Sequence, residues 1–246
     1  MLMLLQDKTA IVYGAAGPVG AAVAGAFARD GARVVLAGRT QQTLARVADQ
    51  IRDAGGAART AVVDVTDTAA MRAHAAEAAA ASGGIDIAFN AISNDDLQGI
   101  PLLDMDLSDF ARPVSKAIAA HFTIATVTAR HMLGGGGVIL AMGGGREAIP
   151  LLGGSHVAWS ALAGLCRQLA AELGPRGIRV AWLLSPGSPD PGAAAPGDGD
   201  PLAGGTLIGR RPSYQEVANA AVFAASDWAA TMTAAEINLT GGAVID

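Results

Sequence analysis

Lysine, tyrosine and cysteine are scarce in this sequence of 246 residues. The only lysines are Lys8 and Lys116, and the only tyrosines are Tyr13 and Tyr214. Neither tyrosine is followed by a lysine four residues later, so no helix can present a Tyr–Lys pair at that spacing. The single cysteine, Cys166, excludes an internal disulfide and fits a reducing compartment. We expect its thiol to be a small core group rather than a nucleophile, because it stands in an apolar stretch.

Charge is also scarce. Charged residues make up 16% of the chain and the net charge is −5, which argues against nucleic acid and anionic membranes as partners. An apolar fraction of 51% allows a large buried core. The first residues lack the basic region of a signal peptide. Residues 9–28 carry no charge and are long enough to span a membrane, but their glycines favour a strand, a turn and a helix. We therefore expect a soluble, cytoplasmic protein.

Short apolar runs alternate with alanine-rich helical stretches along the chain. The predicted strands are Thr9–Tyr13, Arg33–Ala37, Arg59–Val63, Ile85–Asn90, Gly137–Met142, Ile178–Leu184 and Glu236–Leu239, and the predicted helices include Val19–Asp30, Thr40–Ala54, Thr68–Ser82 and Ser155–Leu173. The strands are apolar throughout, as in a sheet that is covered on both faces. This pattern predicts a single α/β domain over residues 1–246, with a Rossmann-type, doubly wound parallel sheet and helices on both faces.

Residues 185–205, "SPGSPDPGAAAPGDGDPLAGG", interrupt this alternation. Their proline and glycine content excludes a regular element. The segment is either a flexible surface loop or a lid. We favour a lid, because the segment follows a strand end, where α/β sheets bind their ligands.

A glycine-rich turn, "IVYGAAGPVGAAVAGAF", connects the first predicted strand to the first helix. Such a turn lets backbone N–H groups and a helix N-terminus approach a pyrophosphate. Further short motifs follow in order: "DVTD" at 64–67, "IDIAFNA" at 85–91, "GPRGIRV" at 174–180, "SPG" at 185–187 and "INLTGG" at 237–242. Together they resemble the short-chain dehydrogenase/reductase family over essentially the whole chain.

The resemblance implies a dinucleotide site. The family's TGxxxGxG motif falls on residues 13–20, where Gly14 and Gly20 match, Tyr13 replaces the threonine, Pro18 replaces the middle glycine, and Gly17 partly compensates. The family's aspartate that contacts adenine corresponds to Asp64. The implied cofactor-binding residues are Gly14, Gly17, Val19, Gly20, Arg39, Asp64, Val65, Asn90, Pro186 and Gly187.

The choice of cofactor depends on "LAGRT", after the second predicted strand. Gly38 offers no carboxylate to a ribose 2′-hydroxyl, whereas Arg39 can pair with a 2′-phosphate. This favours NADP(H) over NAD(H). The alternative is that Arg39 is only a solvated loop residue.

The family's catalytic residues are an Asn, a Ser and a Tyr–Lys pair spaced YxxxK. In this chain the Tyr position holds Ser155 and the Lys position holds Trp159. The Ser position holds Gly144, or its neighbour Gly143, and the Asn position holds Ala117. Trp159 either fills a vacated space or stacks on an aromatic substrate.

Another side chain, or solvent, must then supply the proton. A serine hydroxyl cannot imitate tyrosine, because its pKa is far higher. We take Asp95, Glu147 and His156 as replacement candidates beside Ser155 and Trp159. No metal-ligand pattern is visible.

Three functions remain. The first is an atypical NADP(H)-linked reductase of a carbonyl or activated alkene in a small-molecule substrate, which we favour. The second is a pseudoenzyme that senses a cofactor or binds a partner. The third is a non-redox isomerase, dehydratase or cyclase. The resemblance of "AAEINLTGG" to the family's association region implies a homo-oligomer, a tetramer or dimer.

Overall fold

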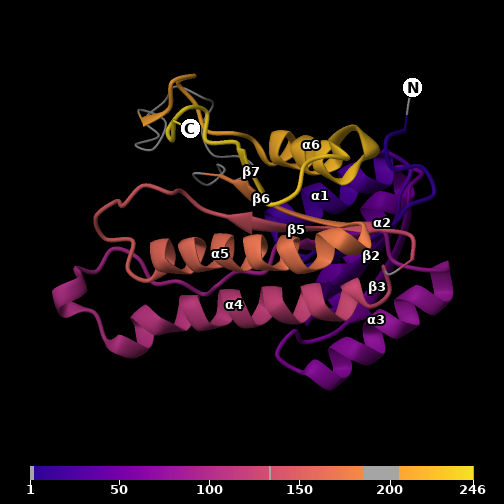
Figure 1. The fold of residues 1–246 in the computed structure, drawn as a ribbon, viewed down its shortest axis with the longest axis horizontal. Helices are drawn as coiled ribbons and strands as arrows, with labels where there is room; N and C mark the ends of the chain where they lie inside the picture. Colours follow the sequence, from indigo (N-terminus) through magenta and orange to yellow (C-terminus); the bar gives the residue numbers. More distant parts are fainter. Residues whose placement is uncertain (1–2, 133, 186–204, 246) are drawn as a thin grey trace.

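The computed structural model describes residues 3–132, 134–185 and 205–245. A seven-stranded parallel sheet in the order β3-β2-β1-β4-β5-β6-β7 forms the centre of the molecule (Figure 1). Its strands are β1 (Thr9–Tyr13), β2 (Arg33–Gly38), β3 (Ala57–Val62), β4 (Ile87–Asn90), β5 (Gly137–Gly143), β6 (Ile178–Leu184) and β7 (Ala235–Asn238). The helices are α1 (Pro18–Arg29), α2 (Gln41–Asp53), α3 (Thr68–Ser82), α4 (Leu107–Ala129), α5 (Ser155–Leu173) and α6 (Tyr214–Ala225).

The helices cover both faces of the sheet. One buried cluster joins α1, α2 and α6 to the sheet, and a second joins α3, α4 and α5 to the opposite face. Figure 1 shows α4 and α5 lying side by side along this second face. The predicted Rossmann-type, doubly wound sheet is therefore confirmed. Cys166 is buried in the second cluster, so its interpretation as a core residue also holds.

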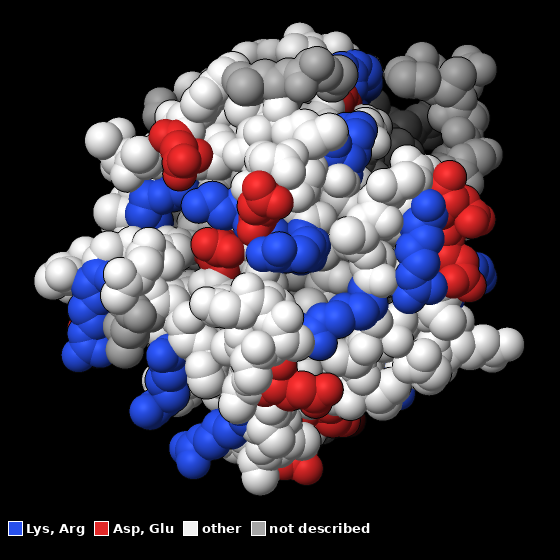
Figure 2. Space-filling model, turned by 90° about the vertical axis from the view of Figure 1, so that its right-hand side faces the viewer, with Lys and Arg blue, Asp and Glu red and all other residues white. Residues whose placement is uncertain are grey.

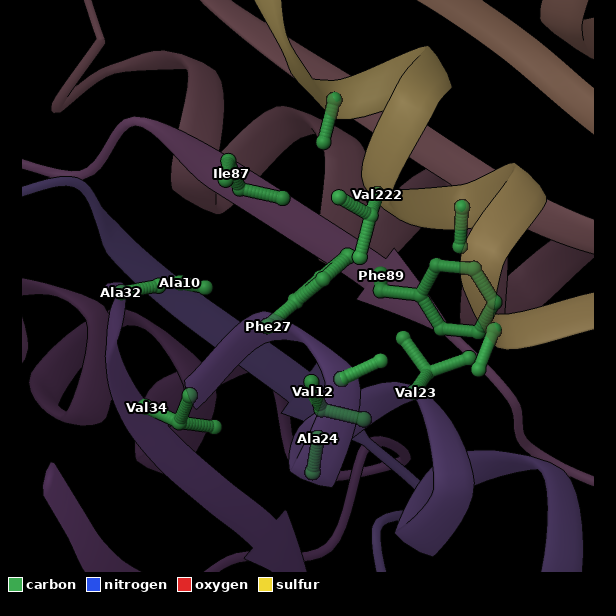
Figure 3. Close-up of a cluster of buried hydrophobic side chains, with 14 of the residues drawn as sticks. Ala10, Val12, Val23, Ala24, Phe27, Ala32, Val34, Ile87, Phe89 and Val222 are labelled. Atoms are coloured by element: carbon green, nitrogen blue, oxygen red, sulfur yellow. The ribbon is translucent and has the colours of Figure 1, made fainter. Parts of the chain in front are cut away.

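Aromatic packing fixes the first cluster (Figure 3). The rings of Phe27 on α1 and Phe89 on β4 meet edge to face, with their centroids 6.1 Å apart. Val12 on β1, Val34 on β2 and Val222 on α6 belong to the same buried cluster. Burial of such side chains contributes about 1.5–3 kcal/mol each, and it holds both helices against the sheet.

Residues 9–28 form β1, a turn and α1, as the glycines indicate. Within the described ranges, no helix is long and apolar enough to cross a membrane. The predicted lid lies almost entirely outside the described residues. The same is true of Pro186 and Gly187, two of the predicted cofactor contacts.

Charged side chains are dispersed on the surface. Figure 2 shows the side of the molecule that lies at the right of Figure 1, where Lys and Arg alternate with Asp and Glu over a mostly uncharged surface. No extended patch of one sign gathers on the described part of that face.

The sheet order places a crevice at the carboxyl ends of the strands. β1 and β4 are neighbours in the sheet, and the order of the strands changes direction there: β2 and β3 lie on one side of β1, and β4 to β7 lie on the other. Open parallel sheets bind ligands at such a switch point. The turns after β1 and β2 and the loop after β4 meet there.

Candidate dinucleotide site

The turn between β1 and α1 is built from close backbone contacts. Gly14 has φ +77°, and a Cβ added there would lie 2.6 Å from the carbonyl oxygen of Ala91. A Cβ at Gly20 would lie 2.3 Å from the carbonyl oxygen of Gly14. Both positions therefore require glycine. Gly17 differs, since its nearest neighbour would be 3.5 Å away, and it leaves its side of the turn open.

A cavity of about 600 Å³ adjoins this turn. Five of the predicted cofactor residues line it, namely Gly14, Gly17, Arg39, Asp64 and Val65. They come from the turns after three adjacent strands, β1, β2 and β3. The structure thus brings together the adenosine half of the predicted site.

Asp64 is held as an ionised acceptor. The backbone N–H and the hydroxyl of Thr66 donate to its Oδ1 at 2.9 and 2.8 Å. These hydrogen bonds, with smaller contributions from the charges of Arg39 and Lys116, lower the pKa of Asp64. Gly38 is confined by Leu44, whose Cδ2 would lie 3.3 Å from an added Cβ. Arg39, the residue after β2, lines the first cavity.

A second cavity, of about 210 Å³, continues from the first. Val19, Asn90, Ala117 and Trp159 are among the residues that line it. The two cavities share residues 91–93 and Lys116. A dinucleotide can therefore extend from the adenosine end to a nicotinamide end beside Asn90, and the glycine turn lies along this path.

A chain of buried contacts holds the side chain of Asn90 in place. Its Oδ1 accepts from the N–H of Ile92 at 3.0 Å, and its Nδ2 lies 3.5 Å from Nδ1 of His121. Because the amide nitrogen can only donate, His121 accepts at Nδ1 and carries its proton on Nε2, which lies 3.4 Å from Sγ of Cys166. Burial lowers the pKa of His121 to about 4. Sequence reasoning missed this histidine, since no motif surrounds it.

Trp159 packs against Gly144. A Cβ added at Gly144 would lie 2.1 Å from Cε2 of Trp159 and 2.4 Å from Cζ2. The indole ring thus occupies the space that a serine side chain at this position needs. Of the two interpretations of Trp159, this contact favours the filling of a vacated space. The ring also forms part of the wall of the second cavity.

Ser155 does not face either cavity. Its side chain is completely buried, and its hydroxyl donates to Oδ2 of Asp96 at 2.6 Å. Nε2 of Gln98 donates to the same hydroxyl at 3.1 Å and to Asp96 at 2.6 Å. These bonds attach the loop after β4 to the first turn of α5. Ser155, which the resemblance places at the family's tyrosine position, therefore has a structural partner.

The three replacement candidates lie in different places. Asp95 lines the first cavity and forms an ion pair with Lys116. Glu147 is exposed on the loop after β5 and lines neither cavity. His156 and Arg146 line a third cavity, which shares Gly143 and Trp159 with the second, and the buried Nδ1 of His156 has no partner among the described residues. The structure does not gather them around one reacting atom, and their roles stay predictions.

Comparisons with known proteins agree with this geometry. Residues 14–244 match a family model described as enoyl-(acyl carrier protein) reductase. The chain is 33% identical to the D-threitol dehydrogenase of Mycolicibacterium smegmatis, covering 98% of this chain and 94% of that protein. It is 31% identical to an A-factor type gamma-butyrolactone 1'-reductase of Streptomyces virginiae, covering 98% and 97%. It also resembles the crystal structure of a short-chain dehydrogenase from Burkholderia cenocepacia in complex with NADP, with a TM-score of 0.84, 29% identity and coverage of 98% and 99%.

Proposed function

Because this chain belongs to the short-chain dehydrogenase/reductase family, we propose that it binds NADP(H) and reduces a carbonyl or activated alkene. The observation that carries this proposal is the pair of connected cavities, with Arg39 at one end and Asn90 at the other. The similar structure from Burkholderia cenocepacia holds NADP, which supports the choice of cofactor. The relatives include a dehydrogenase of D-threitol and a reductase of a gamma-butyrolactone, which supports a small-molecule substrate.

Each part of the site has a task in binding. The open side of the turn at Gly17 and the N-terminus of α1 face the phosphates. Asp64 accepts a hydrogen bond from the adenine, and Arg39 pairs with the 2′-phosphate. When bound, NADPH supplies the hydride. The residues of the second cavity, Asn90 among them, orient the ring that carries it.

Proton supply distinguishes this chain from its family. The Ser155 hydroxyl donates its hydrogen bond to Asp96 and lies outside the second cavity. The proton therefore comes from solvent or from another side chain. Loss of a positioned general acid typically costs about 10²–10⁴-fold in rate. We therefore expect slow turnover on simple ketones.

A second candidate is a cofactor-binding subunit without turnover. It is favoured by the packing of Trp159 on Gly144 and by the burial of Ser155, since both remove groups with which the family performs catalysis. Binding of NADP(H) is common to both candidates. Consumption of NADPH by a substrate separates them.

Calorimetric titration tests the cofactor. NADPH should bind more tightly than NADH, and Arg39→Ala should remove most of the difference. Arg46→Ala, an exposed arginine on α2, is the matched control and should preserve it. Equal affinities of the wild type for both cofactors would overturn the assignment to NADP(H).

A single-turnover assay tests the reaction. NADPH absorbance is followed with excess protein and a panel of ketones, aldehydes and enones. Oxidation of NADPH that depends on both protein and substrate supports the reductase. Tight binding without oxidation supports the binding subunit, and absence of binding contradicts both.

We also infer a homo-oligomer, a dimer or a tetramer. Large apolar side chains are exposed on the helices of the second face, namely Leu107 and Phe122 on α4 and Val157 on α5. An oligomer would remove them from water. Light scattering of the purified protein tests this, and a monomeric mass would overturn it.

A further inference from the structure

The third cavity, of about 250 Å³, is bounded by α5, by the ends of β5 and β6, and by β7. It shares Gly143 and Trp159 with the second cavity, but among the described residues it shares none with the first. Four of its lining residues follow one another at spacings of three or four and so share one face of α5, namely His156, Ser160, Ala163 and Arg167. The third cavity is therefore distinct from the adenosine end of the dinucleotide site.

Glu236 on β7 is the one acidic residue among the described residues that line this cavity, and its charge is already balanced. Its Oε1 forms an ion pair with Nε of Arg146 at 2.7 Å, and its Oε2 accepts a hydrogen bond from Nε1 of Trp182 at 2.8 Å. The Glu236 side chain is only 15% exposed. Glu236 is thus a fixed part of the wall rather than a group that attracts a cationic ligand.

Arg167 adds a positive charge that no carboxylate balances within the described parts of the chain. Its guanidinium carbon lies 5.0 Å from the centroid of the Trp182 ring. This cation–π contact orients the guanidinium but uses none of its N–H donors. Arg167 is exposed, so a ligand can reach these donors. Because Arg146 and Glu236 cancel each other, the arginine and glutamate side chains that line the cavity leave one surplus positive charge.

Much of the remaining lining is apolar. Ala163, Leu184 and Trp159 contribute apolar surface, and Gly145 leaves open space, since no atom lies within 4 Å of a Cβ added there. Sites for drug-sized ligands measure about 300–1,000 Å³, so this smaller cavity suits a smaller molecule. One surplus charge matches a monoanion such as a carboxylate, whose two oxygens fit the guanidinium fork.

We propose that the third cavity binds a small carboxylate with an apolar body, whose anionic group pairs with Arg167 and whose body packs against Trp159. This site goes beyond the proposed reductase, because it requires neither the dinucleotide nor hydride transfer. Trp159 also lines the second cavity, so a ligand bound here contacts a residue of the nicotinamide end.

A titration of 4-fluorobenzoate followed by fluorine NMR tests the site. The wild type should bind this anion with a Kd of about 1 mM, as expected for so small a ligand. Arg167→Met should weaken binding by about tenfold or more, because it removes a charge-assisted hydrogen bond. The uncharged 4-fluorobenzyl alcohol should bind equally weakly to both proteins. Arg176→Met is the matched control, since Arg176 is exposed beyond the end of α5 and outside the cavity, and it should bind like the wild type.

The outcomes separate this site from the dinucleotide site. Equal affinity of the wild type and Arg167→Met for 4-fluorobenzoate would overturn the proposal, as would absence of saturable binding by the wild type. Complete displacement of the anion by NADPH would place it in the dinucleotide site and also overturn the proposal, whereas the affinity for NADPH itself, measured by calorimetry, tests the proposed function independently. Thermal melting shows whether a variant is folded. Ala163→Leu is a second variant, whose larger side chain fills the cavity and should abolish binding.

Tryptophan fluorescence gives an independent measurement. The chain has three tryptophans, of which Trp159 and Trp182 line the third cavity and Trp228 does not. In Trp228→Phe, cyclohexanecarboxylate, which does not absorb the exciting light, should change the emission saturably. Adding Arg167→Met to this background should remove the change. A saturable change that persists without Arg167 would contradict the proposal.

Discussion

Adding one carbon at Gly144 should destabilise the protein through a single neighbour. In Gly144→Ala the new Cβ would lie 2.1 Å from Cε2, 2.2 Å from Cδ2 and 2.4 Å from Cζ2 of Trp159. The indole must therefore move. Gly144 does not require positive φ, so the cost is steric rather than conformational. Overpacking of this kind costs about 1–3 kcal/mol. Because three ring atoms clash, we expect about 2 kcal/mol, or a melting temperature lower by roughly 4–8 °C in a chain of this size.

A double-mutant cycle isolates this contact. Urea unfolding is measured for the wild type, Gly144→Ala, Trp159→Ala and the double variant. In the Trp159→Ala background the added methyl has room, so Gly144→Ala should cost less than about 0.5 kcal/mol and the coupling should be about 2 kcal/mol. Gly145→Ala is the matched control, because no atom lies within 4 Å of its added Cβ. Additive effects would refute the conclusion that Trp159 fills the space beside Gly144.

Two further predictions concern buried polar groups. The pKa of His121 is lowered from 6.5 to about 4, so the unfolded chain binds more protons between these values and stability falls as the pH drops from 6.5 to 4. The loss should be about 3 kcal/mol in urea unfolding and absent from His121→Leu, and an equal pH dependence in the variant would contradict it. Ser155→Ala removes the hydrogen bond to Asp96 and should cost about 1–2 kcal/mol of stability without changing turnover. A fall in kcat above about a hundredfold would show instead that Ser155 takes part in the reaction.

The fold could be predicted because its strands are buried on both faces. β1, Thr9–Tyr13, is buried at every residue, and such continuous apolar runs identify a covered parallel strand. The errors lie at strand ends. β4 begins at Ile87 rather than Ile85, yet the N–H of Asp86 still donates to Thr9 at 3.0 Å. β2 and β5 each extend one residue further, to Gly38 and Gly143, since pairing with a neighbour overrides the low strand propensity of glycine.

The site was predictable only where local motifs encode it. Gly14 and Asp64 belong to short motifs with fixed roles, and the structure places both at the first cavity. The bond between Asp96 and Ser155 joins residues 59 positions apart, and that between Asp95 and Lys116 joins residues 21 apart. No local pattern reports such pairs. The burial of His121, which lowers its pKa, likewise depends on the tertiary packing and not on a local motif.

The sequence contained one signal of the packing between Gly144 and Trp159. The resemblance predicts that Gly144 stands where the family has a larger residue and that Trp159 stands where the family has a flexible one. In the structure the indole of Trp159 occupies the space beside Gly144, as two such exchanges of opposite size require. Opposite changes in size at two positions of one site are the expected signature of such repacking.

The contact between Trp159 and Gly144 predicts that a single replacement by a residue of the family's motif would not restore the family's chemistry. Serine at position 144 would collide with the indole of Trp159. Lysine at position 159 alone would leave a gap beside Gly144, where the indole now packs. Tyrosine at position 155 would remove the hydroxyl that donates to Asp96 and force a phenol into a completely buried site. Each reversion thus costs stability before it gains a catalytic group. Joint replacement of residues 144 and 159 would remove the collision with the indole that a single serine at position 144 would meet.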